Sequence, residues 1–288
     1  MNIRVTGSNG YIGTLLIEKL RKEGHCVLGI QRKHITGPTS VLKGEIRGTD
    51  VIINLAGAPI LQRWTERNRK VIYNSRILST RNLVQAISQL PEEDRPKKLI
   101  SASAIGIYKP GERHTEESTS FDEGFVGKVV KDWENELKAL PKSVQTIIFR
   151  LGVVLGKEAK TIKNMLLPFK IGLGGKIGSG EQSFPFIHET DVINAFVWAT
   201  QEFHKNDTFN LTAPESISNK KFTDALANEL NRPAFFPIPP FALKLIFGKA
   251  SSLLTQSPEV SAEKLQKAGF KFEFPTIDTC LQDIVSKS

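Results

Sequence analysis

The sequence predicts an α/β protein built on a parallel β-sheet that helices cover on both faces. Three observations support this class. Short apolar runs alternate with segments of helical periodicity from residue 2 to residue 150. Glycines fill the turn between the first apolar run and the first helical segment. A chain of 288 residues, 40% of them hydrophobic and 24% charged, is large enough to bury its own core.

The predicted elements follow one another as strand and helix units. We expect strands at 2–6, 26–31, 51–55, 98–102 and 145–150, and helices at 11–23, 66–89 and 124–139. After a glycine-rich stretch come a helix at 190–203, a strand at 208–212 and a helix at 219–230. Parallel sheets of buried strands bind their ligands at the carboxyl ends of the strands, so functional residues are expected just after them.

Cysteine content, apolar runs and charge limit the location and the partners. Cys26 and Cys280 lie in different predicted elements, which supports neither a disulfide framework nor a cysteine-built metal site. No apolar run reaches the ~20 residues of a membrane span, and the first strand leaves no room for a signal peptide. We expect a cytoplasmic protein without a membrane partner. The net charge of +9 favours a small anionic ligand over nucleic acid, because no aromatic-rich basic segment accompanies it.

The turn after the first strand has the pattern Gly-x-x-Gly-x-x-Gly of a phosphate-binding loop. Its residues are Gly7, Ser8, Asn9, Gly10, Tyr11, Ile12 and Gly13. The first glycine allows a tight turn, the second lets backbone amides approach a pyrophosphate, and the third lets the helix pack closely on the strand. The helix N-terminus adds partial positive charge. A plain strand-to-helix turn is the alternative, but the position at residue 7 favours a dinucleotide site.

Residues after the second and third strands indicate which dinucleotide binds. An acidic residue after the second strand would bind the ribose 2′-hydroxyl of NAD, but the sequence has Arg32 and Lys33 there. Their charges attract a 2′-phosphate, so NADP(H) is favoured over NAD(H); solvated turn residues are the alternative. The third strand ends in small residues that leave space for a ribose or adenine, although its asparagine could instead cap the turn. These are Asn54, Leu55, Ala56 and Gly57.

The motifs predict a Rossmann-like, doubly wound parallel sheet with a smaller C-terminal substrate-binding cap. We assign residues 1–155 to the dinucleotide-binding domain, to which 186–212 return. Residues 156–185 and 213–288 form the predicted cap domain, which contains the glycine-rich stretch 172–180 and the proline-rich residues 233–240.

Further segments resemble the extended short-chain dehydrogenase/reductase family. They are Ser101-Ala102-Ser103-Ala104, Asn74-Ser75-Arg76, the run 150–156 and the run 186–191. Within the family, the chain is similar to an epimerase/dehydratase-like branch with a small C-terminal domain of unassigned role. The resemblance implies hydride chemistry, with Ser103 polarising the substrate oxygen and Ser101 and Ala102 beside the cofactor. It also directs Arg76 toward a phosphate of the cofactor or substrate; a hydrated helix face is the alternative.

The resemblance further implies a Tyr-x-x-x-Lys pair for proton transfer, and the chain lacks one. None of the three tyrosines has a lysine four positions later, and the expected helix carries Phe125 and Val129 instead. Tyr108, on a loop expected to overhang the nicotinamide, and Lys128, on the helix, are candidate substitutes. The alternatives are a half-buried loop aromatic and a solvated lysine.

Two further residues are candidates for substrate contact. Gln182 lies in a glycine-rich loop that resembles a lid, and His188 precedes the helix expected at 190–203. His188 and Asp191 have the spacing of two metal ligands but lack a third, so no metal is predicted. Asp191 is expected to cap the helix.

Two functions therefore remain. The first is an NADP(H)-binding epimerase, dehydratase or reductase that acts by hydride transfer on a small carbonyl or sugar-nucleotide-type substrate. The second is a non-catalytic NADP(H)-binding regulator or sensor, which loss of the Tyr-Lys pair favours. The substrate itself and the formation of a homodimer are left open.

Overall fold

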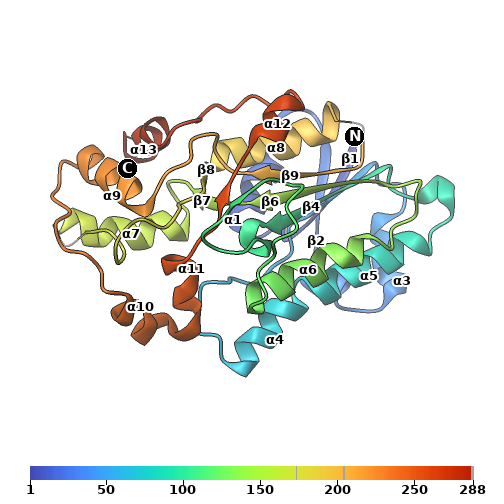
Figure 1. The fold of residues 1–288 in the computed structure, drawn as a ribbon. Coiled ribbons are helices and arrows are strands. Elements are labelled where there is room, and N and C mark those ends of the chain that lie inside the picture. The colour runs from blue at the N-terminus through green and yellow to red at the C-terminus, as the bar shows by residue number, and fades with distance from the viewer. Residues whose placement is uncertain (173, 204, 287–288) are drawn as a thin grey trace.

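In the computed structural model, which describes residues 1–172, 174–203 and 205–286, a six-stranded sheet forms the centre (Figure 1). Its strands are β1 (Asn2–Thr6), β2 (Cys26–Ile30), β3 (Val51–Asn54), β4 (Lys98–Ala104), β6 (Gln145–Leu151) and β9 (Asp207–Leu211). Their order is β2-β1-β3-β4-β6-β9 and every neighbouring pair is parallel. The predicted doubly wound α/β class is confirmed. Residue 173 of the glycine-rich stretch lies outside the described part.

Helices cover both faces of this sheet. One face packs on α1 (Tyr11–Lys22) and α8 (Glu189–Gln201), and the other on α3 (Thr39–Ile46), α5 (Ile77–Ser88) and α6 (Phe125–Leu137). Alternate strand residues point to opposite faces, so Val5 and Ile53 pack toward α1 and α8 while Ile52 and Leu99 pack toward α3 and α5. This double burial explains the successive apolar residues of inner strands, such as Val51, Ile52 and Ile53 of β3.

A second hydrophobic core lies beside the sheet. It joins residues of α7 (Lys160–Lys170), β8 (Phe186–His188), α9 (Asn219–Glu229) and α13 (Ile277–Ser286). The short strand β7 (Val153–Leu155) pairs with β8 at its edge. Further short elements are α10 (Pro240–Phe247), α11 (Ser252–Thr255), β5 (Arg113–His114), β10 (Glu259–Val260) and α12 (Glu263–Lys267). Leu265 and Phe270 pack into the core of the sheet, so the C-terminal segment crosses back over it.

The single helix expected at 66–89 is wrong, because the chain forms two helices there. α4 (Glu66–Asn74) ends before Ser75, and α5 begins after Arg76. The Ser75 hydroxyl donates to the carbonyl of Ile72 at 3.0 Å and accepts the backbone N–H of Ala58 at 2.9 Å. A side chain that bonds the backbone in this way competes with the helical pattern, and it ties the break to the segment after β3.

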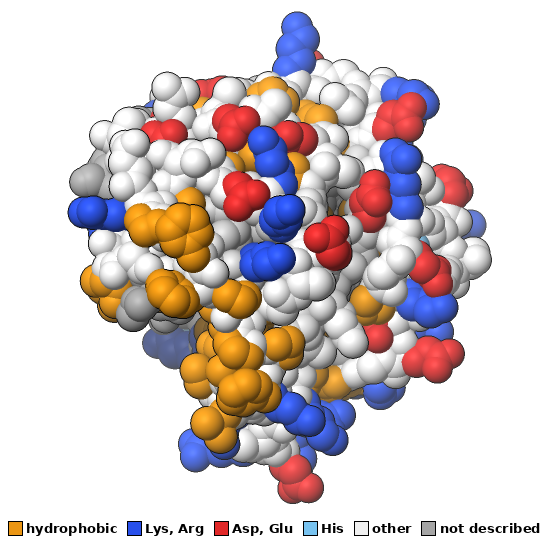
Figure 2. Space-filling view, turned by 60° about the vertical axis from the view of Figure 1, so that its left-hand side comes forward, with side chains coloured by type: hydrophobic (Ala, Val, Ile, Leu, Met, Phe, Trp, Pro, Cys, Tyr) orange, Lys and Arg blue, Asp and Glu red, His pale blue; other side chains and the backbone are white. Residues whose placement is uncertain are grey.

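One surface of the molecule carries a group of exposed apolar side chains on α7, on α10 and on the segment before α10 (Figure 2). They are Leu167, Ile171, Phe235, Phe236, Phe241, Leu245 and Ile246. Residues 159–180 and 231–257 contain lysine and arginine but no aspartate or glutamate. This surface therefore combines apolar groups with positive charge. Within the described residues, no helix has both the length and the apolar character needed to cross a membrane.

Candidate functional site

The glycine loop packs directly against the end of β3. Gly7 has φ +67°, and a Cβ there would lie 2.6 Å from the carbonyl oxygen of Leu55. A Cβ on Gly13 would lie 2.3 Å from the carbonyl oxygen of Gly7, which also accepts the N–H of Gly10 at 2.9 Å. No side chain caps the N-terminus of α1 and no acid lies in its first turn. These backbone amides can therefore receive a diphosphate at the carboxyl edge of the sheet.

The remaining loop side chains point in different directions. Ser8 lies over β2, where the missing Cβ of Gly29 makes room for it. Asn9 is exposed, and Ile12 packs against the core of the sheet. The Tyr11 hydroxyl is buried without a hydrogen-bond partner among the described residues. The loop thus presents backbone rather than side chains to a ligand.

Arg32 and Lys33 follow β2 directly, in the short helix α2 (Arg32–Ile35). Both side chains are exposed, and neither forms an ion pair with a described carboxylate. Two free positive charges therefore lie beside the strand that flanks the glycine loop, where a ribose 2′-phosphate would need them.

Asn54 is a buried cross-link between strands. It accepts the hydroxyl hydrogen bond of Thr6 at 2.7 Å and donates to Thr80 at 3.0 Å and to Ser101 at 3.2 Å. The indole N–H of Trp133 also donates to Thr80, at 2.9 Å. The side chains of Asn54 and Ser101 thus lie inside the protein, and Asn54 caps no turn among the described residues. That they contact the cofactor stays a prediction. The sequence signal of this network is the asparagine that ends the strand Val51–Asn54. A buried side-chain amide needs hydrogen-bond partners, so its presence there indicates that polar neighbours exist.

The hydroxyl of Thr6 also accepts the backbone N–H groups of Leu55 and Ala56, each at 3.1 Å. The segment that leaves β3 is therefore held against the end of β1. Ala102, on β4, is partly exposed beside this region. The two bonds hold the backbone of Leu55 and Ala56 where it packs against Gly7.

Arg76 lies against the backbone of Gly57. A Cβ on Gly57 would lie 3.1 Å from the guanidinium carbon of Arg76, a tight contact that glycine avoids. The Arg76 Nη1 donates to the carbonyl of Ile72 at 3.2 Å, and the guanidinium carbon lies 5.4 Å from the ring centre of Trp133. Burial lowers the pKa of Arg76 to about 10. The structure thus brings two predicted ligand-binding residues, Gly57 and Arg76, into contact.

Ser103 belongs to a buried ionic network. Its hydroxyl donates to Oε1 of Glu134 at 2.6 Å, and Arg150 donates to the same carboxylate at 2.9 and 2.8 Å. Burial alone would lower the pKa of Arg150, but the bonds to Glu134 raise it above its usual value. Sequence analysis missed Glu134, and it named Arg150 only as part of a resemblance. Ser103 is thereby held at the carboxyl end of β4.

Tyr108 is fully buried. The sequence had suggested either a residue that overhangs the nicotinamide or a half-buried loop aromatic. Its hydroxyl donates to Oδ1 of Asn210 at 2.8 Å and accepts from Nη1 of Arg150 at 2.7 Å. Its ring stacks on His114 with 4.7 Å between the ring centres. Burial raises the pKa of Tyr108 above its ordinary value. A phenol with both hydrogen-bonding directions used and no exposed surface is poorly placed to exchange a proton with a substrate.

Lys128 lies on the exposed side of α6, away from Tyr108. Its ammonium pairs with Asp132 at 3.0 Å, and Asp132 also accepts the hydroxyl of Tyr73 at 2.9 Å. The hydrogen bond to Asp132 raises the pKa of Lys128 and keeps it protonated. The structure does not bring together the two candidate substitutes for the missing Tyr-Lys pair.

Gln182 joins the glycine-rich loop to the segment around Leu254. Its side-chain amide donates to the carbonyls of Ile177 at 3.1 Å and Leu254 at 3.3 Å. Gln182 therefore holds the glycine-rich loop to α11. A role in substrate contact stays a prediction.

His188, not Asp191, caps α8. The His188 Nδ1 accepts the N–H of Thr190 at 3.1 Å, and its ring lies 3.9 Å from that of Phe274. Asp191 sits in the first turn, where its carboxylate accepts the backbone N–H groups of Glu273 at 2.7 Å and Phe274 at 3.1 Å. A capping residue precedes the first turn in extended backbone, and His188 occupies that position. Both side chains therefore anchor the C-terminal segment.

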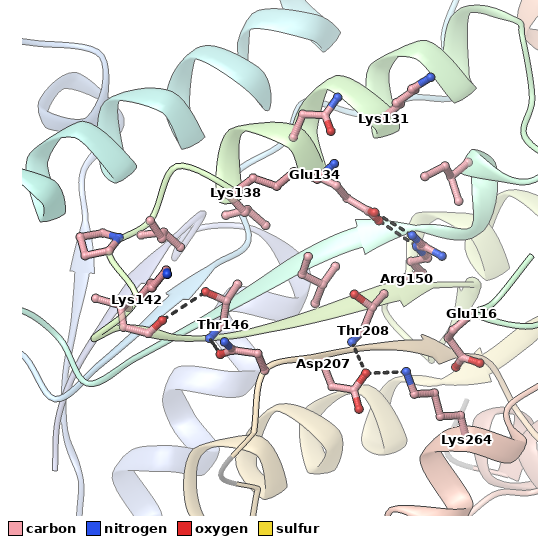
Figure 3. Close-up of a pocket in the computed structure, with 18 of the residues that line it drawn as sticks. Glu116, Lys131, Glu134, Lys138, Lys142, Thr146, Arg150, Asp207, Thr208 and Lys264 are labelled. Atoms are coloured by element: carbon pink, nitrogen blue, oxygen red, sulfur yellow. Dashed lines mark hydrogen bonds and ion pairs between the residues drawn. The ribbon is translucent and has the colours of Figure 1, made fainter. Parts of the chain in front are cut away.

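A hollow of about 680 Å³ lies along β6 and β9 beside α6 (Figure 3). The pair Glu134–Arg150 lies toward one end of it, and Asp207 pairs with Lys264 beside β9. β3 and β4 separate β6 from β1 and its glycine loop. Because it is remote from that loop and its buried charges are paired, we do not assign the cofactor to this hollow.

Helix α10 contacts the segment that follows β3. Arg63, which follows β3, donates from Nε to the carbonyl of Ile246 at 2.9 Å and from Nη2 to that of Leu245, at the end of α10. Helix α10 is thus fixed beside the segment that carries Gly57. Together with the glycine loop, this arrangement defines a nucleotide-binding protein of the epimerase and dehydrogenase type.

The chain belongs to the NAD dependent epimerase/dehydratase family, which it matches over residues 3–212. Residues 238–284 match DUF1731, a domain of unknown function. The resemblance to this branch of the extended short-chain dehydrogenases/reductases is confirmed.

Relatives match along the whole chain. The mouse epimerase family protein SDR39U1 is 33% identical over 297 residues, which cover 99% of this chain and 100% of the relative. Epimerase family protein YfhF of Bacillus subtilis is 32% identical over 301 residues, covering 99% of this chain and 98% of that protein. The crystal structure of human SDR39U1 (isoform 2) with NADPH superimposes with a TM-score of 0.93 at 32% identity, covering 100% of both chains.

Proposed function

We propose that this protein binds NADP(H) and acts by hydride transfer on a small carbonyl or sugar-nucleotide-type substrate, as an epimerase, dehydratase or reductase. The glycine loop carries the proposal, because its backbone contacts leave the uncapped amides of α1 free for a diphosphate. The exposed Arg32 and Lys33 favour NADP(H) over NAD(H). The human relative, whose structure was determined with NADPH, supports the same choice.

The residues present fit this cofactor. Gly7 to Gly13 would hold the diphosphate, Arg32 and Lys33 the 2′-phosphate, and the backbone of 55–57 the sugar between β1 and β3. When bound, NADP(H) supplies a nicotinamide that gives or takes a hydride. We further propose that residues 156–185 and 213–288 form the cap domain that holds the substrate. Arg63, in the segment after β3, bonds to the end of α10 and ties this domain to the sheet.

Ser103 is the proposed group that polarises the substrate oxygen. Its hydroxyl lies at the carboxyl end of β4, and Glu134 accepts its proton in a hydrogen bond of 2.6 Å. That bond uses the single hydroxyl proton of Ser103, so in the proposed reaction the proton turns from Glu134 to the substrate oxygen, and Arg150 stays paired with Glu134. Phe125 and Val129 pack with Trp133 in an apolar cluster and hold no exchangeable proton.

Replacing the two cations after β2 tests the choice of cofactor. We expect Arg32→Ser/Lys33→Ser to lower NADPH affinity about 10- to 100-fold by removing charge-assisted bonds, and to leave NADH affinity unchanged. Fluorescence titration measures both constants. Lys244→Ser/Lys249→Ser, which removes two exposed charges near α10, is the matched control. An equal loss for both nucleotides would contradict the assignment.

Replacing Ser103 tests the proposed reaction. NADPH oxidation is first screened with carbonyl compounds and nucleotide sugars. For any substrate turned over, we expect Ser103→Ala to lower kcat about 10²- to 10³-fold, since a donor to the reacting oxygen is lost. Ser120→Ala, which removes a similar hydroxyl bonded to Glu112 at the surface, should leave kcat unchanged. Undiminished turnover in Ser103→Ala would eliminate this role.

A non-catalytic NADP(H) sensor is the second candidate, favoured by the apolar packing of Phe125 and Val129 where a Tyr-Lys pair is absent. Tight NADPH binding without turnover, and a partner whose binding changes with the cofactor, would support it.

We also propose a reducing location such as the cytoplasm, since Cys26 and Cys280 are unpaired. Light scattering tests the homodimer that the sequence left open.

A further inference from the structure

Arg76 is a partly buried cation with few partners in its own chain. Among the described residues, no carboxylate lies within ion-pair distance of its guanidinium, and only Nη1 has a hydrogen-bond acceptor, the carbonyl of Ile72 at 3.2 Å. A guanidinium has five N–H donors, so most of its donors are unused. Burying an unpaired charge is costly in free energy, and the lowered pKa of Arg76, caused by burial alone, expresses that cost. An anion that binds from outside the chain would pair with this charge and offset the free-energy cost of its burial.

The position of Arg76 separates it from the cofactor phosphates. If the proposed function holds, the adenosine half lies over β2 beside Arg32, and the diphosphate lies at the glycine loop. The other half then lies over β3 and β4. Arg76 contacts Gly57, just after β3, and Trp133 of α6, a helix that packs against β4. Arg76 is therefore on the nicotinamide and substrate side of the site.

The surroundings of Arg76 suit a small anionic molecule. Trp64 and Phe125 pack against the same apolar cluster as Trp133, with 5.2 Å between the ring centres of Trp64 and Phe125. The guanidinium of Arg69 lies 4.5 Å from the ring centre of Phe125. Arg76 thus lies against an aromatic cluster, and a second, exposed cation lies over Phe125 of the same cluster.

We propose that Arg76 binds an anionic group of the substrate, a carboxylate or a phosphate, beside the nicotinamide position. The inference rests on the proposed function and narrows its substrate class from carbonyl compounds in general to anionic ones. Gly57 is part of this subsite, because a side chain there would press on the guanidinium of Arg76. Arg76 is then a specificity-determining residue that pairs with the substrate.

Calorimetry on the NADPH-saturated protein tests the proposal with three probes: oxamate, inorganic phosphate and the neutral oxamide. We expect oxamate or phosphate to bind, according to which anion the subsite fits, and oxamide not to bind. Arg76→Gln should weaken the bound anion about tenfold or more, while NADPH affinity stays within about twofold. Arg67→Gln, an exposed arginine of α4, is the matched control and should bind like the wild type.

Thermal unfolding without ligand gives a second readout. Because Arg76→Gln removes a partly buried charge that has no carboxylate partner, its Tm should equal or exceed that of the wild type. A clear fall in Tm would assign Arg76 a structural role and overturn the proposal. So would equal anion binding by both proteins, no anion binding by the wild type, or a loss of NADPH affinity in the variant.

Failure of the proposed function gives a different result. A wild type that binds no NADPH would refute the cofactor assignment. In that case, anion titrations on the unloaded wild type and Arg76→Gln still decide whether Arg76 is the anion receptor.

Discussion

Gly13→Ala should destabilise the protein by about 3 kcal/mol and reduce NADPH binding to an undetectable level. The new Cβ would lie 2.3 Å from the carbonyl oxygen of Gly7 and 3.0 Å from the Cα of Ser8. Both neighbours are backbone atoms of the loop that would hold the diphosphate, so relief of the clash must open that loop. Urea unfolding and fluorescence titration with NADPH measure the two effects.

Gly44→Ala provides the control for a glycine inside a helix. A Cβ at Gly44 in α3 meets no atom within 4 Å. Because alanine favours helix over glycine, this variant should be more stable than the wild type by up to about 1 kcal/mol, with NADPH affinity unchanged. Effects of the same sign in both variants would contradict the close packing of the glycine loop.

Glu134→Ala should destabilise the protein by about 3–5 kcal/mol. The side chains of Arg150 and Glu134 are only 10% and 12% exposed, so the substitution leaves a guanidinium buried without its carboxylate. Ser103 loses the acceptor of its hydroxyl proton at the same time. Denaturant unfolding measures the free energy, and any turnover found with the wild type should fall as well.

Two comparisons separate burial of charge from loss of a contact. Glu263→Ala breaks the exposed pair with Lys267 and should leave the stability nearly unchanged, because solvent screens that pair. Glu134→Leu/Arg150→Met removes both buried charges and should recover much of the stability lost in Glu134→Ala. If the double variant is no more stable than Glu134→Ala, unpaired charge is not the cause.

Local sequence was sufficient for the fold class and the phosphate loop. Short strands rich in apolar residues can be buried on both faces only in a covered sheet. The glycines at 7, 10 and 13 act within a few residues of each other. Arg32 and Lys33 could likewise be placed, because their position depends only on where β2 ends. Each of these features follows from neighbours close in the chain.

Only the tertiary structure determined which polar groups face inward. Asn54 and Ser101 point into a network between strands, Tyr108 bonds to Asn210 at a separation of 102 residues, and Asp191 accepts bonds from the segment after Phe272. Arg76 meets Gly57 because α4 ends at Asn74, and the next residue, Ser75, accepts the N–H of Ala58 in the segment after β3. Hydrogen bonds and burial between distant segments decide these orientations, and periodicity along the chain carries no information about them.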